Sequence, residues 1–364
     1  MKKLNILFVI SSALTNGGVA AVTMKIVDSL KEECQFDIIV TGKQAGFYDE
    51  KFLSYGGKII RTNTVDYQKS KIGIVKKGKY IYDAVIEACK EKKYDVIHCE
   101  NGFESGQAVL AATKCGIPIK IVHAHGTYST KGKNIIAKIY RLNCKRLIEK
   151  YSNIKLACSL KAGRSLFYSN FKNILNPLNV DYYQSIKKKE HTCINLLQIG
   201  YYCKLKNQKF SLQILEDLLK RNVDSKLYFI GFDDGSGYFP SLVKDIELKN
   251  LEERVFFLPS NFPKQEIMKK IDYLLLPSIS EGLPLVALEA QSANIHTIVS
   301  DAVSDDVNLG LCSFLPISDS NLWVDEIISL IGSSKVLNMD KLDYIRDDNY
   351  IAIIKEIYFQ KNSF

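Results

Sequence analysis

Two glutamates near residue 285 are the side chains of this sequence best placed to do chemistry. Glu281 and Glu289 bracket the apolar turn Gly282-Leu-Pro-Leu-Val286, which follows the buried-looking strand Tyr273–Leu276 and opens a helix. Pro284 suits the first helical position, and the N–H groups and positive dipole end of that helix favour a phosphate in the loop. Glu281 could then meet the hydroxyls of a reacting group, while Glu289 leans back toward the helix start and can reach a ribose. A helix start with two solvated acids is the alternative for a bare pair.

A glycine turn after the first apolar run offers a second place for a phosphate. Gly17 and Gly18 follow the strand expected at Asn5–Ile10 and precede a helical pattern over Val19–Lys31. Glycines let the backbone approach a ligand closely, and the helix start supplies N–H donors for a diphosphate. The turn lacks the G-x-G-x-x-G pattern of dinucleotide enzymes, and a merely structural turn is the alternative.

Three histidines at strand ends are further candidates. His123 ends the expected strand Lys120–His123, and His125 lies in the loop that follows. A loop histidine there could donate a hydrogen bond to a sugar. Two histidines at this spacing could also suggest a metal site, but no Cys, Asp or Glu cluster joins them in the sequence. We expect His123 to be a core histidine with satisfied hydrogen bonds. His98, at an earlier strand end, suits the wall of a site or the core equally well.

The elements that must position these residues alternate along the chain. Short apolar runs and helical periodicity follow one another, which is typical of parallel sheets covered by helices. The pattern breaks near Leu175–Asp181 and is followed by the polar run that begins at Lys187, which favours a linker there. We therefore expect an α/β protein with two doubly wound, Rossmann-like domains, at 1–180 and 190–342, facing each other across a cleft. Such folds bind ligands at the carboxyl ends of their strands.

Composition agrees with this architecture. The chain has 364 residues, a formal net charge of +9 and nine cysteines without C-x-x-C or zinc spacing. The length suits two domains, and the odd cysteine count indicates thiols in a reducing cytosol. The N-terminal apolar run is too short for a secretory signal and favours a first strand. No segment approaches the length of a transmembrane helix.

The string Pro277-Ser-Ile-Ser-Glu281-Gly-Leu-Pro-Leu-Val286, with Glu289, resembles the signature of retaining glycosyltransferases of the GT-B fold, in particular glycosyltransferase family 4. The stretch Gly200-Tyr-Tyr-Cys-Lys204-Leu-Lys206-Asn207 is similar to the family's Gly-Arg-x-x-x-x-Lys-Asn segment. A cation there neutralises the diphosphate leaving group. The resemblance implies catalytic roles for His125, Glu281 and Lys206. It implies donor binding by Gly17, Gly18, Lys204, Gly282, Leu283, Leu285, Val286 and Glu289, and contact with the base near Leu258 and Ser260. It also implies a terminal helix, within 343–364, that crosses back to the first domain.

One position departs from the family pattern. Tyr201 stands where the family has arginine, which suggests that Lys204 or a first-domain residue supplies the missing charge. No Asp-x-Asp motif occurs, so we expect no metal ion and no other cofactor: lysine and the helix dipole would neutralise the diphosphate.

A basic stretch at 131–150 could contact a membrane. Its cations are Lys131, Lys133, Lys138, Arg141, Lys145, Arg146 and Lys150, interleaved with apolar residues. A basic amphipathic helix can lie on an anionic leaflet, whereas the alternative is a solvated helix that packs on its own domain.

The resemblance implies a metal-independent hexosyl- or N-acetylhexosaminyltransferase. It would move a sugar from a nucleotide sugar, expected to be a UDP-sugar, to an oligosaccharide or lipid-linked glycan in capsule or other surface polysaccharide synthesis. The expected location is cytoplasmic, or peripheral at the inner face of the plasma membrane. Two alternatives stay open: a UDP-sugar epimerase of GT-B type, and a non-catalytic sugar-nucleotide or glycan-binding subunit in which Tyr201 marks lost activity. Nucleic acid is not expected as a partner, because no binding motif accompanies the basic residues.

Overall fold

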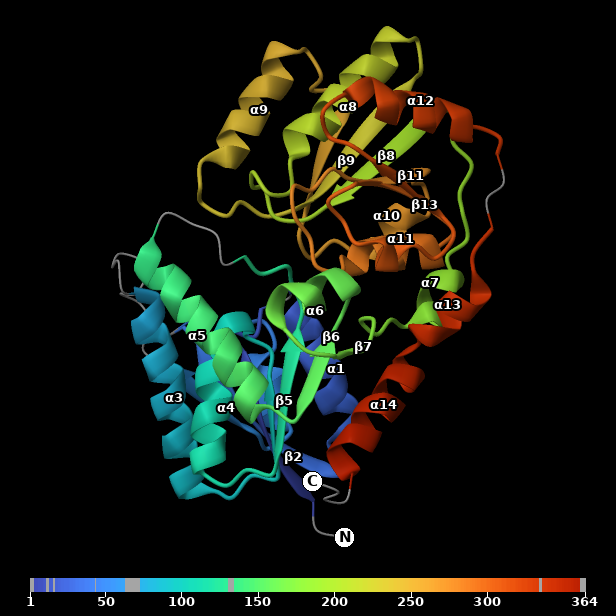
Figure 1. Cartoon of the computed structure of the whole chain (residues 1–364). Coiled ribbons are helices and arrows are strands. Elements are labelled where there is room, and N and C mark those ends of the chain that lie inside the picture. Colours follow the sequence, from blue (N-terminus) through green and yellow to red (C-terminus); the bar gives the residue numbers. More distant parts are fainter. Residues whose placement is uncertain are drawn as a thin grey trace. The chain divides into compact units, whose positions relative to one another are not determined.

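The computed structural model describes residues 3–10, 13–15, 17–42, 44–62, 73–129, 134–333 and 336–360. The chain forms two compact units, shown in Figure 1. Unit 1 comprises the chain up to Pro177 together with the segment from Asp348 onward, and unit 2 runs from Leu178 to Asp347. The ranges expected from the sequence are 1–180, 190–342 and 343–364. Their first boundary lies a few residues after the observed one at Pro177, and their second lies a few residues before the observed one at Asp347.

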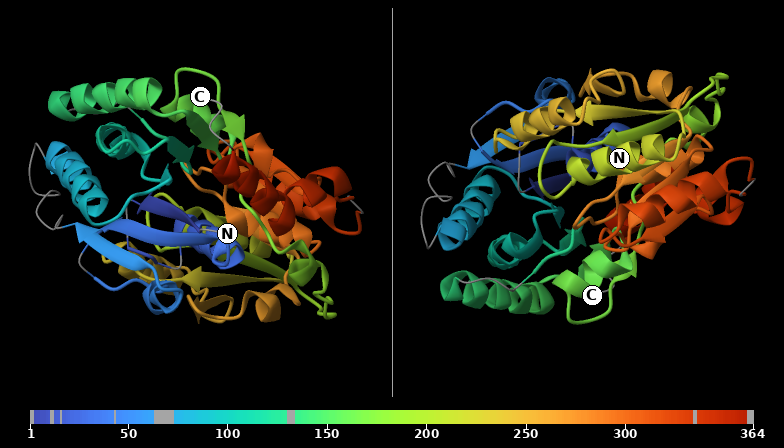
Figure 2. Two further views of the ribbon diagram at one scale, coloured as in Figure 1. Left: turned by 90° about the horizontal axis from the view of Figure 1, so that it is seen from below. Right: turned by 90° about the horizontal axis from the view of Figure 1, so that it is seen from above.

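Unit 1 is built on a seven-stranded parallel sheet in the order β3-β2-β1-β4-β5-β6-β7. Its middle strands are apolar runs buried on both faces, as β1 illustrates, where Ile6–Ile10 are fully buried. Helices cover both faces of this sheet, which can be followed in Figures 1 and 2. The strands are β1 (Leu4–Ile10), β2 (Cys34–Thr41), β3 (Lys58–Thr62), β4 (Val96–Cys99), β5 (Ile119–Ala124), β6 (Ile154–Ala157) and β7 (Lys172–Asn173). The α-helices are α1 (Gly18–Leu30), α2 (Asp49–Ser54), α3 (Gly73–Glu91), α4 (Ser105–Lys114), α5 (Ile135–Tyr151), α6 (Leu160–Leu166) and α14 (Asp347–Phe359).

Unit 2 repeats the design with a six-stranded parallel sheet in the order β10-β9-β8-β11-β12-β13. The strands are β8 (Ile194–Ile199), β9 (Ser225–Gly231), β10 (Val255–Pro259), β11 (Tyr273–Leu276), β12 (His296–Ser300) and β13 (Cys312–Leu315). The α-helices are α7 (Val180–Gln184), α8 (Gln208–Lys220), α9 (Tyr238–Leu248), α10 (Lys264–Met268), α11 (Leu285–Ser292), α12 (Ser320–Leu330) and α13 (Met339–Tyr344).

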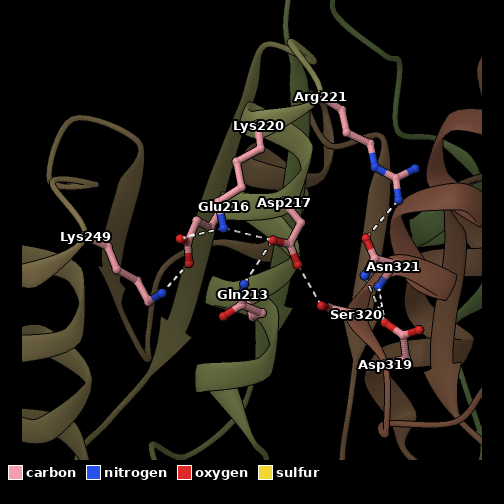
Figure 3. A network of polar contacts seen from close by, with 9 residues as sticks. All are labelled: Gln213, Glu216, Asp217, Lys220, Arg221, Lys249, Asp319, Ser320 and Asn321. Carbon is pink, nitrogen blue, oxygen red and sulfur yellow. Dashed lines mark hydrogen bonds and ion pairs between the residues drawn. The ribbon is translucent and has the colours of Figure 1, made fainter.

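Helix α8 shows how the outer layer of unit 2 is fixed. Its apolar stripe, Leu212, Leu215 and Leu218, is buried against the sheet, and Phe210 lies edge-on to Trp323 of α12 at 5.5 Å. Figure 3 shows the polar contacts at the other side of the helix. Asp217 accepts a hydrogen bond from Ser320 at 2.7 Å, and Glu216 pairs with Lys220 at 2.8 Å and with Lys249 at the end of α9. Helix α8 is thereby joined to its neighbours on both sides.

Both sheets contain a point where the chain reverses its direction of winding. In unit 2 the chain proceeds from β8 outward to β9 and β10, and then returns to place β11 on the other side of β8. The loops after β8 and β11 therefore leave the same edge of the sheet in opposite directions. In unit 1 the equivalent place lies between β1 and β4. Open parallel sheets bind ligands at such switch points.

Candidate functional site

The loops after β8 and β11 bring together the two residues that the sequence assigned to the same reaction. Lys206 Nζ donates a hydrogen bond to Glu281 Oε1, in a contact that is also an ion pair. Ser278 Oγ donates to the same carboxylate oxygen at 2.8 Å. The side chains of Lys206 and Glu281 are 23% and 13% exposed, so this charge pair lies at the surface of the sheet edge with little water around it.

Backbone and amide contacts hold these two loops in register. Ile279 N–H donates to Leu205 O at 2.8 Å, which joins the loops directly. The buried amides of Gln198 and Gln208 donate to Lys206 O at 2.6 Å and to Tyr201 O at 2.8 Å. The position of Lys206 is thus set by the sheet and by the start of α8, because Gln198 lies in β8 and Gln208 begins that helix.

Gly200 lets the lysine side chain cross the sheet edge. It has a φ of +153°, and a Cβ at this position would lie 3.2 Å from Lys206 Cε and 3.3 Å from its Cδ. Gly231, at the end of β9, is closer still, because a Cβ there would lie 2.1 Å from Gly200 O. Glycine at both positions allows the β8 and β9 ends to pack and the Lys206 stem to lie across them.

The turn after Glu281 ends at a helix N-terminus, as expected. Pro284 is the N-cap of α11 rather than its first helical residue, and the helix begins at Leu285. No side chain caps this end among the residues that the structure describes. The N–H groups at Leu285 and Val286 belong to the first turn of α11, which carries the positive end of the helix dipole. Leu283 is buried and Gly282 is half-buried, so they support the turn.

Glu289 lies inside α11, and its side chain is only 9% exposed. Both of its carboxylate oxygens accept hydrogen bonds from Lys264 Nζ, at 2.7 and 2.6 Å. Tyr183 of α7 lies close to the same carboxylate: burial raises the pKa of its phenol, and the charge of Glu289 raises it further. A carboxylate offers about four acceptor sites, of which Lys264 takes about two and the Tyr183 phenol about one, so about one is left for a hydroxyl of a ligand.

The remaining donor-side candidates lie nearer to solvent. Tyr201 is 38% exposed, and its ring is 4.2 Å from that of Phe232, which follows β9. Lys204, two residues before Lys206, is exposed. At the end of β10, Leu258 is half-buried and Ser260 is exposed, so backbone groups there are open to a ligand.

In unit 1 the three histidines gather around a carboxylate that the sequence did not single out. His98 Nε2 and His125 Nε2 lie 3.8 and 3.7 Å from Glu100 Oε1, and the ring of His123 lies 5.6 Å from His98 and 4.1 Å from His125. Two expectations are wrong: an acid does join the histidines, and His123 has no hydrogen-bond partner in the described part of the chain, although it is fully buried. His98, His123 and Glu100 could hold a metal ion.

Burial and charge act in opposite directions in this cluster. Burial lowers the pKa of His98 to about 4 and holds the pKa of His123 well below its usual range. Burial also lowers the pKa of His125, but Cys158 and Glu100 outweigh it and raise that pKa to about 10. The side chain of His125 is 4% exposed and faces Glu100.

The glycine turn of unit 1 precedes α1 as expected. Gly17 is the N-cap of α1, with no side-chain cap in the described part of the chain, and Gly18 is exposed at its first position. The first turn of α1 contains no acid that would repel an anion.

Most of the basic stretch at 131–150 lies in helix α5, but its cations are not all exposed. Lys131 and Lys133 lie outside the described residues. Ile135, Ile136 and Ile139 are 63%, 41% and 62% exposed, and Lys138 and Arg146 are exposed beside them. Lys145, one of the cations of the stretch that could contact a membrane, is buried: its ammonium donates to Ser165 O at 3.2 Å and lies 4.2 Å from the ring centre of Tyr168. Within the described ranges, no helix is both long enough and apolar enough to cross a membrane.

A cavity of about 670 Å³ occupies the opposite edge of the unit 2 sheet. It is lined in part by His191, Asp272, Tyr273 and His296, and the last two begin β11 and β12. It therefore lies at the amino ends of the strands, away from Lys206 and Glu281. The ligand site of a doubly wound sheet is expected at the carboxyl ends.

Sequence reasoning missed several residues that hold the site together. Ser278 stood inside the quoted motif and could have been found there. Gln198, Gln208 and Lys264 carry no local signal, because their partners lie 7 to 25 residues away. Glu100 follows β4 directly, and the rule that strand ends meet at one edge of a parallel sheet could have placed it beside His125.

Comparisons with known proteins agree with this geometry. Residues 183–305 match the family model described as Glycosyl transferases group 1. The chain is 27% identical over 337 residues to the putative glycosyltransferase EpsF of Bacillus subtilis (strain 168), covering 87% of this chain and 85% of that protein. It is 25% identical over 362 residues to the capsular polysaccharide biosynthesis glycosyltransferase CapH of Staphylococcus aureus, covering 97% and 98%. It is 24% identical over 350 residues to the UDP-Gal:alpha-D-GlcNAc-diphosphoundecaprenol alpha-1,3-galactosyltransferase of Escherichia coli, covering 88% and 86%.

A solved structure gives the same fold. The Anabaena protein Alr3699/HepE in complex with UDP superposes with a TM-score of 0.71 at 15% identity, covering 98% of this chain and 96% of that one. The expectation of two Rossmann-like α/β domains of GT-B type is confirmed. Together with the family match and the relatives, this supports a GT-B glycosyltransferase.

Proposed function

We propose that this protein is a retaining glycosyltransferase of family 4 that uses a UDP-sugar. The observation that carries the proposal is the Lys206–Glu281 pair at the switch point of the unit 2 sheet, beside the open N-terminus of α11. The cation and the helix start can bind a diphosphate, and the carboxylate can accept hydrogen bonds from the hydroxyls of a sugar. The relatives named above, from capsule and lipid-linked glycan synthesis, support the same class of reaction.

In this proposal the donor is bound by unit 2. Glu289 accepts hydrogen bonds from the ribose, and the base meets backbone groups near Leu258 and Ser260. The N–H groups of the α11 start, in the turn formed by Gly282, Leu283, Leu285 and Val286, receive the diphosphate together with Lys206. The resemblance also assigns Gly17 and Gly18 to donor binding.

Lys206 and Glu281 then have separate tasks. Lys206 stabilises the charge that develops on the leaving phosphate when the bond between the anomeric carbon and the phosphate oxygen breaks. Glu281 accepts hydrogen bonds from hydroxyls of the transferred sugar. The acceptor oxygen bonds to the anomeric carbon on the face that the phosphate leaves, and the phosphate oxygen takes the acceptor proton. Retention follows, and no side chain has to act as the base.

The cations that neutralise the diphosphate differ from the family pattern, because Tyr201 stands where the family has arginine. Its ring packs on Phe232 and offers no cation, so Lys204, which is exposed two residues before Lys206, takes the second cationic position. We propose that no divalent ion takes part in this step. A hexose or an N-acetylhexosamine is the sugar transferred.

The acceptor is proposed to be a growing oligosaccharide on a lipid carrier, positioned by His125 in unit 1. Helix α5 provides the reason for a membrane-bound acceptor: Ile135, Ile136 and Ile139 are exposed beside Lys138 and Arg146. Apolar and cationic side chains on one helix favour docking on an anionic leaflet. The protein would then act at the inner face of the plasma membrane, from the cytoplasm.

A donor panel tests the proposal. The purified protein is incubated with UDP- and GDP-sugars, with and without lipid-linked acceptors, and released nucleotide is measured. Release of UDP with transfer of the sugar is the expected result. A protein that binds UDP but releases none with any donor would be a non-catalytic subunit, and conversion of one UDP-sugar into its epimer would make it an epimerase.

A further inference from the structure

A buried cluster in unit 1 has the composition of a metal site. We propose that His98, Glu100 and His123 bind a first-row divalent metal ion, for which zinc is the ion that best suits the donor set. Two imidazoles and one carboxylate are a known zinc-binding combination, and imidazole nitrogen is a ligand that zinc favours. This ion is distinct from the donor chemistry of unit 2, and the site does not depend on the proposed glycosyl transfer.

The polar atoms of the cluster lack partners. His98 Nε2, Glu100 Oε1 and both ring nitrogens of His123 find no hydrogen-bond partner among the residues that the structure describes. His98 and His123 are fully buried and Glu100 is 2% exposed, so bulk water cannot satisfy these atoms. Buried polar groups without a partner are rare because their desolvation is uncompensated. Apart from the ion-pair contact of Glu100 Oε1 with His125 Nε2 at 3.7 Å, an ion or a buried water between these atoms would supply the missing partners.

The hydrogen bond at the far side of His98 turns its free nitrogen toward that space. His98 Nδ1 lies 2.7 Å from the hydroxyl oxygen of Tyr358 in α14. If Nδ1 carries the proton and donates it to Tyr358, the lone pair of Nε2 faces Glu100 Oε1 at 3.8 Å. Two acceptors then face each other, which a cation between them would resolve. If Nε2 carries the proton instead, 3.8 Å is too long for a hydrogen bond.

Neighbouring side chains hold the other atoms of the proposed ligands in place. Thr23 Oγ1 donates a hydrogen bond to the second carboxylate oxygen, Glu100 Oε2, which leaves Oε1 for an ion. His98 stacks on Phe8 with ring centres 5.1 Å apart. Ligating histidines and carboxylates are commonly oriented by such partners on their other atoms. His125 Nε2 lies 3.7 Å from Glu100 Oε1, so its imidazole borders the same space.

An ion and a water molecule would need different distances between the three ligand atoms. The three ligand atoms lie within 4.8 Å of one another. Zinc bonds of about 2.0–2.2 Å require these atoms to approach by about 1 Å relative to this arrangement, whereas a water molecule needs less movement. A buried water that bridges the same atoms is therefore the competing occupant.

The position of the cluster indicates a structural ion. His98 lies in β4, His123 in β5 and Glu100 directly after β4, while Thr23 comes from α1 and Tyr358 from the last helix, α14. An ion at this place would join the centre of the sheet to helices from both ends of the chain. Because metal binding adds to the free energy of folding, unit 1 would become more stable with rising zinc concentration.

The test uses the full-length protein without a histidine tag. Metal content is measured by mass spectrometry after purification, and chelator-treated protein is titrated with zinc chloride while its melting temperature is followed. About one zinc ion per chain and a rise in melting temperature are expected. In Glu100→Gln and His123→Gln, zinc affinity should fall by about 10- to 100-fold or more.

A matched control separates the site from adventitious binding. His191→Gln changes an accessible histidine of unit 2 and should leave zinc content and the zinc-dependent rise in melting temperature as in the unmodified protein. The proposal is overturned if chelator-treated protein binds no zinc, or if the Glu100 and His123 variants bind it as well as the His191 variant does. Cobalt substitution gives a second readout: the visible absorption of bound Co²⁺ should be present in the unmodified protein and absent in His123→Gln. Ordered water in a crystal structure, without anomalous signal at the zinc edge from zinc-soaked crystals, would also refute the proposal.

Discussion

Replacing Glu289 by alanine should weaken UDP binding far more than it destabilises the protein. The wild-type carboxylate is 9% exposed, and Lys264 and Tyr183 together use about three of its roughly four acceptor sites, leaving about one for a ribose hydroxyl in the proposed site. A hydrogen bond to a charged group contributes about 1.5–3 kcal/mol. The dissociation constant for UDP should therefore rise by about 10- to 150-fold, since about 1.4 kcal/mol corresponds to a factor of ten.

The effect of Glu289→Ala on folding is expected to be small by comparison. The substitution leaves Lys264 and Tyr183 without their shared partner, but the lysine side chain is 38% exposed and can be hydrated. Ion pairs with such exposure contribute about 0–1 kcal/mol to the free energy of unfolding. Thermal denaturation should show a folded variant, so the loss of UDP affinity can be assigned to the site.

Calorimetric titration with UDP measures the change, and Lys264→Met is the matched control. That variant keeps the carboxylate and removes only the ammonium, so UDP affinity should change by no more than about fivefold, the equivalent of an exposed ion pair. The reasoning is refuted if folded Glu289→Ala binds UDP as well as the unmodified protein. It is also refuted if Lys264→Met loses as much affinity as Glu289→Ala, because the lysine would then be the group that contacts the nucleotide.

Three further predictions address the sugar, the metal and the membrane. Glu281→Gln should lower kcat by about 10- to 150-fold with the correct donor while free UDP binds nearly as before, because in the proposed site Glu281 contacts the sugar and not the nucleotide; full kcat would remove it from the reaction. Activity should survive EDTA added to the assay as long as the melting temperature shows a folded protein, and it should not increase with Mg²⁺ or Mn²⁺. Loss of activity by folded protein on chelation, with recovery on adding either ion, would show that an ion handles the leaving diphosphate. Sedimentation with vesicles should increase with anionic lipid and decrease with salt. The double variant Lys138→Gln with Arg146→Gln should be released from the vesicles, whereas the control Lys220→Gln with Arg254→Gln should stay bound. Docking by α5 is contradicted if the unmodified protein does not sediment with anionic vesicles at low salt.

The sheets could be predicted from the sequence because their strands are continuous apolar runs. The expected strand Asn5–Ile10 corresponds to β1 (Leu4–Ile10), and Tyr273–Leu276 is β11 without change. Two of the four edge strands were harder to predict. β13 (Cys312–Leu315) is short and only half-buried, so neither its length nor its polarity marks it as a strand. β7 consists of two polar residues that are held by pairing with β6.

The candidate site could be predicted only as far as its motif extends. The motif gave Glu281, Glu289 and the helix start, and the structure brings Lys206 into contact with Glu281 across 75 residues. Pairings of this kind depend on which strands become neighbours, and the local sequence does not determine that order. The same cause explains the contact of Glu100 with His125, which arises only because β4 and β5 are adjacent.

Charge patterns proved a weaker guide than strand patterns. The run of cations in α5 suggested one solvated face, yet Lys145 lies buried with its ammonium over Tyr168. A long side chain can bury its stem while its charge finds a carbonyl or an aromatic ring. Only the packing of α5 on unit 1 decides which of its cations stay in water.

The most direct test of the central claim is transfer of sugar from a UDP-sugar, measured with the unmodified protein and with Lys206→Met side by side. The account predicts that the unmodified protein releases UDP and forms a glycoside with retained anomeric configuration. Lys206→Met should bind the acceptor but lose about 100-fold or more in kcat, because the leaving phosphate loses its cation. Equal turnover by the two proteins, or an inverted anomeric configuration in the product, would contradict the account.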